Sequence, residues 1–296
     1  RVPLNGSYGE ISFPSIFKMK RYLTKNNYDI IHLHNFLPFI STTGILINSN
    51  AKKVMTVHTY PNKRWQYILD KNLLWKAGTA HIDHFIFVSK SQELMYKNLD
   101  NKYSLIPNGI DINEEAKPRS IKDKDVYKIL FIGRKDPRKG FSHLMRAFKL
   151  LQKRLPGKVE LHIIGAEKPL FNNNFGIKFY GKVDNEEYRA IQKDCDIMIC
   201  PSTHSESFGL VLLEGMNEGL PVVSFDNPGY RSVLKGYLKK GIAKEKTSHS
   251  LAEKIYEVLT DHTLYEKLSR EGLRQVKAYD WKKIAIEIES IYRSLY

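Results

Sequence analysis

Short β-branched or aromatic runs alternate with helical patterns along the chain, which predicts βαβ units and parallel sheets. The predicted strands of the first part are Asp29–His34, Val54–His58, Phe85–Ser89 and Tyr103–Ile106. Those of the second part are Lys128–Gly133, Glu160–Gly165, Ile177–Gly181, Asp196–Cys200 and Pro221–Phe225. The fold class is therefore α/β, with one parallel sheet in each part.

Two helical regions follow from apolar spacing. Phe141 to Leu155 carries apolar residues three and four positions apart, the pattern of a helix that packs on a sheet. Leu251 to Tyr296 is predicted to be helical throughout. Its last part offers an apolar surface to a neighbour through Trp281, Ile284, Ile286, Ile288 and Ile291.

A chain of 296 residues suits two domains. The stretch Pro107–Val126 has turn chemistry without periodicity, and we interpret it as the region that joins them. The predicted divisions are a first domain at 1–111, a linker at 112–126, a second domain at 127–277, and a C-terminal helix at 278–296 that packs back on the first domain. A complete doubly wound domain begins with a strand and a Gly-rich turn, so we expect the first domain to lack its first strands.

The charge balance points to an anionic partner. The chain has 47 Lys and Arg against 32 Asp and Glu, a net charge of +15, which suits nucleic acid, acidic lipid or a phosphorylated small molecule. We expect no nucleic-acid partner, because no basic stripe with interleaved aromatic residues is visible. No apolar run approaches the roughly 18 residues of a spanning helix. Cys195 and Cys200 flank one predicted strand and are not expected to pair, which fits a reducing cytoplasm.

The most informative segment is Pro201–Glu214, a polar loop between a predicted strand and an amphipathic helix. The backbone amides of Phe208, Gly209 and Leu210 are expected to open the helix and to suit a diphosphate. Glu206 can accept hydrogen bonds from sugar hydroxyls and Glu214 from a ribose. The two carboxylates are too distant for a hydrolase pair, because eight helical residues rise roughly 12 Å.

A second loop, Gly133–Gly140, also follows a strand and precedes a helix, and it carries four cations. Arg134 can hold phosphate oxygens bidentately, while Lys139 supplies a compact charge. Together they would neutralise a diphosphate leaving group. The loop lacks the Gly-x4-Gly-Lys-Ser/Thr pattern of a P-loop.

Two motifs that resemble metal sites are not interpreted as such. We expect His32 and His34 to point to opposite faces of a strand, which would keep them from chelating one ion. Asp194-Cys195-Asp196 imitates an Asp-x-Asp motif but lies where a helix turns into a buried strand, so we expect a structural role. We predict no bound metal.

The order of these motifs resembles glycosyltransferase family four over nearly the whole chain. The matching segments are His32-Leu33-His34, Val57-His58-Thr59, Ile106–Asp111, Gly133–Gly140 and the Glu-x7-Glu loop. The resemblance implies a GT-B fold of two Rossmann-like domains facing a cleft, retention at the anomeric carbon, and no metal or other cofactor. It assigns donor binding to Gly133, Arg134, Lys139, Val183, Asp184, Glu206, Ser207, Phe208, Gly209, Leu210 and Glu214, and a position facing the transferred sugar to His58.

Within this family, the opening is similar to phosphatidylinositol mannosyltransferases. The resemblance matches Lys18, Lys20 and Arg21 to a membrane-facing basic cluster, and Lys63 to a lysine that meets the acceptor. A helix with these cations beside Phe17 and other apolar residues suits anionic headgroups, each cation contributing on the order of 1 kcal/mol.

The expected function is transfer of mannose from GDP-mannose to a phosphatidylinositol-like lipid, in the cytoplasm on the inner face of the membrane. His58, Arg134, Lys139 and Glu206 are the expected catalytic residues. A UDP-sugar-dependent transferase acting on diacylglycerol or a polysaccharide intermediate is the enzymatic alternative. A non-catalytic protein that binds sugar nucleotides or anionic lipid is the alternative of another class.

Overall fold

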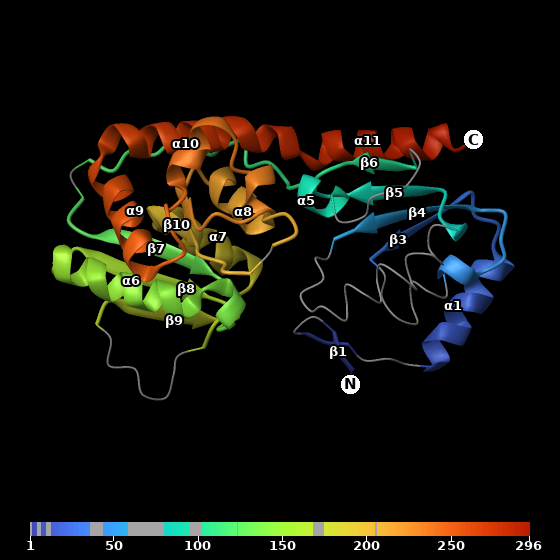
Figure 1. Cartoon of the computed structure of the whole chain (residues 1–296), viewed down its shortest axis with the longest axis horizontal. Helices are drawn as coiled ribbons and strands as arrows, with labels where there is room; N and C mark the ends of the chain where they lie inside the picture. Colours follow the sequence, from blue (N-terminus) through green and yellow to red (C-terminus); the bar gives the residue numbers. More distant parts are fainter. Residues whose placement is uncertain are drawn as a thin grey trace. The chain divides into compact units, whose positions relative to one another are not determined.

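A computed structural model describes residues 2–4, 7–9, 13–35, 44–58, 80–94, 102–122, 124–167, 175–204 and 206–296, with side chains from Phe17 onward. The chain forms two compact units (Figure 1). Unit 1 is Arg1–Asn108 with Lys282–Tyr296, and unit 2 is Gly109–Trp281. The predicted divisions after 111 and after 277 lie close to these positions.

Unit 1 is built on one parallel sheet. Its elements are β1 (Val2–Leu4), β2 (Ser7–Gly9), α1 (Phe13–Lys25), β3 (Ile30–His34), β4 (Lys52–Val57), β5 (His84–Phe87), α5 (Lys90–Glu93), β6 (Tyr103–Leu105) and most of α11 (Trp281–Ser294). The four strands β3 to β6 follow one another in sheet order, and His34 pairs with Thr56. The antiparallel pair β1 and β2 was not predicted from the sequence.

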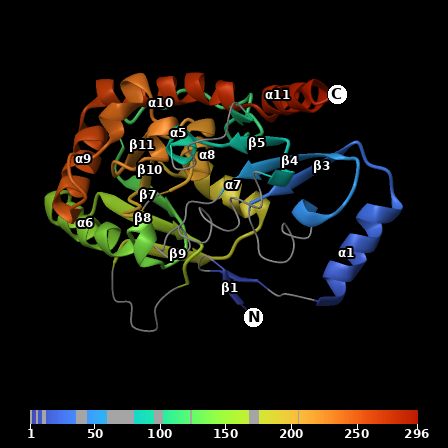
Figure 2. The ribbon, with the colours of Figure 1, turned by 45° about the vertical axis from the view of Figure 1, so that its right-hand side comes forward.

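Helix α11 packs on this sheet (Figure 2). Ile284 and Ile291 share a buried cluster with Val54, Ile86 and Ile106. A β-branched strand face meeting an apolar helix stripe is the packing that the alternating pattern predicts. The stripe is narrower than expected, because the Ile286 side chain is 66% exposed.

Unit 2 also holds one parallel sheet. Its elements are β7 (Tyr127–Ile132), η2 (Pro137–Lys139), α6 (Phe141–Arg154), β8 (Val159–Ile164), β9 (Ile177–Gly181), α7 (Asn185–Asp194), β10 (Ile197–Cys200), α8 (Leu210–Asn217), β11 (Val222–Ser224), η3 (Tyr230–Ser232), η4 (Gly236–Gly241), α9 (Ser248–Thr260), α10 (His262–Val276) and η5 (Lys277–Tyr279). The strand order is β11-β10-β7-β8-β9. All nine strands predicted from the sequence are present, with bounds that differ from the prediction by at most two residues.

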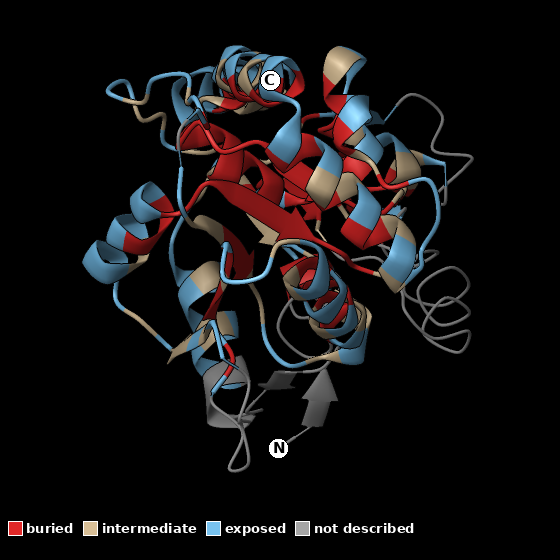
Figure 3. Ribbon diagram, turned by 90° about the vertical axis from the view of Figure 1, so that its left-hand side faces the viewer, coloured by how far each residue is buried: buried red, intermediate tan, exposed pale blue. Residues whose placement is uncertain are grey.

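The core of unit 2 lies between this sheet and its helices. Strands β8 and β10 are almost entirely buried and β7 is buried at its centre, whereas the helices turn their exposed faces outward (Figure 3). Helices α6 and α9 pack side by side in Figures 1 and 2. Phe141, Leu144, Phe148 and Leu151 of α6 are buried, as the spacing predicted.

The segment interpreted as a linker, 112–126, belongs to unit 2. The side chain of Ile121 is fully buried, and Arg119 donates hydrogen bonds to the carbonyl oxygens of Glu218 at 2.9 Å and Lys193 at 3.1 Å. The segment is therefore not a separate linker, because tertiary hydrogen bonds attach it to the domain that follows it.

The prediction of one helical region from Leu251 to Tyr296 was wrong in detail. Asp261 ends α9 and caps α10, because its Oδ1 accepts a hydrogen bond from Leu264 N at 2.9 Å. A short 3-10 turn then separates α10 from α11. Among the described residues, no helix is both long and apolar enough to cross a bilayer.

Candidate functional site

The sheet order of unit 2 creates a topological switch point. From β7 the chain continues through α6 to β8, whereas from β10 it continues through α8 to β11, on the other side of the sheet. Strands β7 and β10 are parallel neighbours, with Met198 beside Leu130. In open α/β sheets, ligands bind outside the carboxyl ends of strands at such a point. The two loops predicted to bind the donor, Gly133–Gly140 and 201–209, both begin there.

These two loops are tied to each other. Thr203 N donates to Arg138 O at 3.0 Å. Gly140 has a φ of +71°, and a Cβ at this position would lie 1.8 Å from the carbonyl oxygen of Pro201. Only a glycine allows both the left-handed backbone and this close approach.

Lys139 and Glu206, one from each loop, form an ion pair at 2.8 Å. Glu206 Oε1 also accepts a hydrogen bond from Ser202 Oγ at 2.8 Å, and Ser202 Oγ accepts one from the hydroxyl of Tyr230 at 3.0 Å. Tyr230 is buried, and burial raises the pKa of its hydroxyl well above the ordinary value. The neutral hydroxyl of Tyr230 therefore orients Ser202, which in turn holds the carboxylate of Glu206.

Asn227 holds the backbone of the same loop. Its side chain is fully buried; Oδ1 accepts from Glu206 N at 2.9 Å and Gly229 N at 3.3 Å, and Nδ2 donates to His204 O. The roles of Asn227, Tyr230 and Ser202 were not predicted from the sequence. The available signal for Asn227 was the Asn-Pro-Gly turn that begins two residues after the predicted strand.

The cations of the first loop differ in their partners. Arg138 binds Asp136, with Nη2 and Oδ2 2.6 Å apart, and the hydrogen bond from Arg138 holds the pKa of Asp136 at about 2. Its charge is thus matched inside the loop. Arg134 is exposed at the end of β7, next to Gly133. The expected convergence of four cations is therefore reduced by the Arg138–Asp136 pair.

Helix α8 begins as predicted at the second loop. Leu210 is its first residue, and Gly209 caps it with a φ of +106°. Ser207 precedes this turn, and Phe208 is buried with its ring 5.8 Å from that of Tyr279. Backbone amides at the start of a helix suit an anion.

Glu214 and the residues after β9 are linked through α7. Glu214 accepts a short hydrogen bond from the hydroxyl of Tyr188, whose pKa is raised by burial. Asp184 caps α7, because its Oδ1 accepts from Glu187 N at 2.9 Å. Val183 directly precedes that cap. The carboxylate of Asp184 is thus engaged in holding the helix that carries Tyr188.

Unit 1 carries the remaining predicted residues. His58 follows β4, and its Nε2 lies 2.8 Å from Nδ1 of His34. Lys18, Lys20 and Arg21 lie exposed on α1. Lys63 lies outside the described residues.

The prediction that His32 and His34 point to opposite faces was wrong. Residues two apart on a strand share a face, and their rings stack with centroids 4.6 Å apart. His32 is nevertheless engaged elsewhere: its Nε2 lies 2.7 Å from Thr56 Oγ1, and its Nδ1 lies 2.5 Å from the hydroxyl of Tyr292. The described residues contain no group of three or more His, Cys, Asp or Glu side chains able to hold a metal ion.

The acidic motif at the start of β10 has structural contacts. Asp194 pairs with Lys128 at 2.7 Å, and Asp196 accepts from Lys128 N at 2.8 Å. Cys195 and Cys200 are both buried free thiols. These contacts agree with the structural role expected for Asp194 and Asp196.

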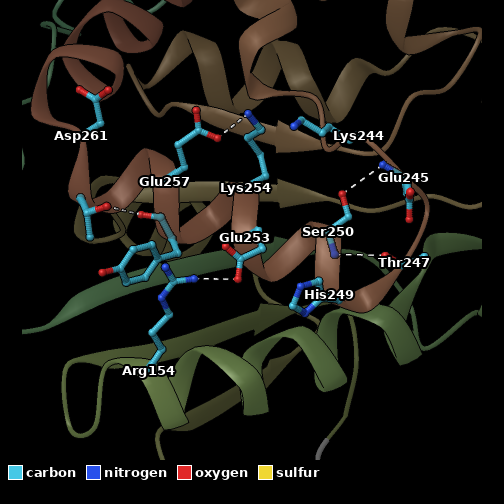
Figure 4. Close-up of a pocket in the computed structure, with 12 residues that line it drawn as sticks. Arg154, Lys244, Glu245, Thr247, His249, Ser250, Glu253, Lys254, Glu257 and Asp261 are labelled. Carbon is cyan, nitrogen blue, oxygen red and sulfur yellow. Dashed lines mark hydrogen bonds and ion pairs between the residues drawn. The ribbon is translucent and has the colours of Figure 1, made fainter.

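A cavity of about 640 Å³ in unit 2 lies away from the loops, along α9 (Figure 4). Four of its charged side chains form two ion pairs, Arg154 with Glu253 and Lys254 with Glu257, both at 2.7 Å. We therefore place the candidate site at the loops after β7 and β10, where Lys139 and Glu206 face each other.

Two α/β units with parallel sheets, one of them with a basic and an acidic loop at its switch point, are an arrangement typical of nucleotide-binding proteins. The chain belongs to the glycosyl transferases group 1 family, whose model matches residues 112–275, and residues 1–114 match the model of glycosyltransferase family 4. It is a glycosyltransferase with the GT-B fold.

Similar proteins support this assignment. The phosphatidyl-myo-inositol mannosyltransferase of Mycobacterium tuberculosis (strain CDC 1551 / Oshkosh) is 27% identical over 99% of this chain and 82% of that protein. The structure of Anabaena Alr3699/HepE in complex with UDP and glucose is 19% identical, with a TM-score of 0.77 over 95% of this chain and 81% of the other. Sucrose-phosphate synthase from Thermosynechococcus elongatus is 21% identical, with a TM-score of 0.74 over 95% of this chain and 77% of the other.

Proposed function

We propose that the protein transfers mannose from GDP-mannose to a phosphatidylinositol-like lipid, with retention at the anomeric carbon and without a metal or other cofactor. The observation that carries donor binding is the Lys139–Glu206 pair, which joins the loops after β7 and β10 at the switch point. The proposed sugar and acceptor take their support from the mannosyltransferase of M. tuberculosis, which is similar over nearly the whole chain.

In this proposal unit 2 holds the donor. Arg134 and Lys139 neutralise the diphosphate, and the first amides of α8 donate to its oxygens. Glu206 accepts hydrogen bonds from sugar hydroxyls, and Glu214 from the ribose. Val183 and Asp184 lie near the base.

The transfer step needs no group beyond donor and acceptor. The bond between the anomeric carbon and the diphosphate oxygen breaks, and a bond to the acceptor hydroxyl oxygen forms on the same face. The proton of that hydroxyl goes to the leaving phosphate. The cations then offset the negative charge that grows on the diphosphate, an interaction that strengthens in the transition state.

The replacement Glu206→Ala tests the enzymatic role. We expect lost turnover with retained GDP or UDP affinity, because the carboxylate contacts the sugar and not the diphosphate. Glu253→Ala, which removes a carboxylate from the cavity in Figure 4, is the control and should retain turnover. If the unaltered protein binds sugar nucleotides but transfers nothing to any acceptor, the non-catalytic alternative holds. A UDP-sugar preference in the same assay would replace GDP-mannose as donor.

We further propose that α1 docks on the inner face of an anionic membrane. Lys18, Lys20 and Arg21 are exposed, and the apolar side chains of Phe17 and Tyr22 are 72% and 62% exposed on the same helix. Cations beside exposed aromatic residues suit the interface of an anionic bilayer.

Liposome sedimentation tests this docking. Changing Lys18, Lys20 and Arg21 together to Ser should release the protein from anionic vesicles. The control changes Lys149, Lys153 and Lys158 to Ser, which removes the same charge from exposed positions on or just after α6. Equal partitioning of both variants would refute a role specific to α1.

A further inference from the structure

Three histidines of unit 1 lie in a row: His32 at the middle of β3, His34 at its end, and His58 directly after β4. The ring centroids of His32 and His34 are 4.6 Å apart, and those of His34 and His58 are 5.1 Å apart. The second pair also has a hydrogen-bond contact, with 2.8 Å between Nδ1 of His34 and Nε2 of His58. Both nitrogens of His32 are occupied by Thr56 and Tyr292.

The contact between His34 and His58 requires one proton between two nitrogens. A neutral imidazole has one N–H and one lone-pair nitrogen, so two neutral rings satisfy the contact in fixed tautomers. If both rings became cationic, two N–H groups would face each other and the contact would break. In agreement, the pKa of His58 is lowered by burial and by the neighbouring charge of His34.

The backbone around the pair is fixed independently of its protonation. Asn35 adopts a φ of +62°, a left-handed conformation that Asn tolerates. Its Oδ1 accepts from His58 N at 2.6 Å, and its own N–H donates to Thr56 O at 2.8 Å. The turn after β3 thus places His58 against His34.

Other groups face the pair from neighbouring elements. His32 stacks beside His34 on β3, and Tyr292 of α11, whose hydroxyl pKa is raised by burial, contacts His32. Asn108 hydrogen-bonds His58 and raises its pKa, which opposes the effects of burial and of His34. Asn108 thus favours the charged form of His58, whereas His34 favours its neutral form.

We propose that His34 is a positioning residue that keeps His58 neutral and in a single tautomer, so that the ring expected to face the transferred sugar has a fixed hydrogen-bonding pattern. This inference rests on the proposed function for its catalytic consequence. It predicts that transfer is lost at acidic pH, when Nδ1 of His34 and Nε2 of His58 both carry a proton and the contact between them breaks.

The test combines imidazole NMR with a pH profile. In 15N-histidine-labelled protein, His58 should titrate below pH 6.5 in one tautomer. In His34→Phe, which keeps an aromatic ring but removes the proton and the charge, the pKa of His58 should rise by about 0.5 pH unit or more. The acid limb of kcat/KM should move up by a similar amount. His34 is largely exposed, so the replacement leaves the core intact.

The matched control is His84→Phe, the same change on β5 of the same sheet, where His84 contacts Ser104 at 2.9 Å. It should leave both the His58 titration and the acid limb unchanged. If His34→Phe does not fold, His34→Asn removes the same charge and should raise the pKa of His58 too. An unchanged His58 titration in the His34 variant overturns the proposal, as does an acid limb that fails to follow a raised pKa.

The two readouts separate this inference from the proposed function. NMR reports on the His34–His58 pair in the protein whether or not it transfers sugar. A protein with the predicted titration but no transfer contradicts the proposed function. Transfer with an unperturbed His58 contradicts the role of His34.

Discussion

Replacing Gly140 with Ala tests the close approach of the two donor loops. A Cβ at this position would lie 1.8 Å from Pro201 O, far inside van der Waals contact, and the φ of +71° is unfavourable for Ala. The left-handed backbone alone costs about 1–2 kcal/mol, and overpacking adds about 1–3 kcal/mol. We therefore expect Gly140→Ala to destabilise unit 2 by about 2–5 kcal/mol.

Gly157→Ala is the matched control. Gly157 has a φ of +72°, yet a Cβ there would meet nothing within 4 Å, so only the backbone cost of about 1–2 kcal/mol applies. Native-state hydrogen exchange at the amides of β7 and β10 measures both losses in unit 2. Gly140→Ala should also weaken nucleotide binding at least tenfold, because the loops must separate. Equal stability losses in the two variants would refute this account of the loops.

Three further predictions concern polar side chains that form hydrogen bonds within one unit. Asn227→Ala leaves its three backbone partners unpaired, so unit 2 should lose about 2–4 kcal/mol in denaturant unfolding and kcat/KM should fall at least tenfold; unchanged turnover would show that Glu206 holds its place unaided. His32 has its pKa lowered from 6.5 to about 4, mainly by burial, so its contribution to the stability of unit 1 is complete above pH 6.5 and is lost as pH falls towards 4. Without screening, this shift would change the free energy of unfolding by about 3.4 kcal/mol, and solvent screening of the half-buried ring reduces the change to roughly 1–2 kcal/mol. Between pH 7 and pH 4, urea unfolding should therefore show a smaller loss of stability in His32→Gln than in the unaltered protein. Tyr188→Phe removes the hydroxyl that orients Glu214 and should weaken donor binding about 2- to 10-fold by calorimetry, whereas equal affinity would separate Glu214 from donor binding.

The strands were predictable because a parallel sheet buried on both faces needs continuous β-branched and aromatic runs. Each predicted strand lies where such a run occurs, and the two loops predicted to bind the donor begin where the sequence changes to polar residues after Ile132 and Cys200. The helix start at Leu210 likewise lies within the segment Phe208–Leu210 that was expected to open the helix.

The errors came from interactions between distant segments. The hydrogen bonds of Arg119 to Glu218 and Lys193 attach a turn-rich stretch to unit 2, and no local pattern encodes them. Asn227 lies 21 positions from Glu206, so its hydrogen bond to that residue was equally invisible. The wrong prediction for His32 and His34 had another cause. The period of two residues in a strand already places both side chains on one face, so the sequence alone was sufficient to predict this correctly.

Isothermal titration with GDP-mannose, UDP-glucose, GDP and UDP tests the central claim, that the loops after β7 and β10 bind a sugar nucleotide. The unaltered protein is compared with Arg134→Ala/Lys139→Ala, and with Lys149→Ala/Lys153→Ala as a control of equal charge. We predict micromolar binding of one nucleotide series, lost in the first variant and retained in the control. Absence of binding by any nucleotide, or equal binding by all three proteins, would contradict the account.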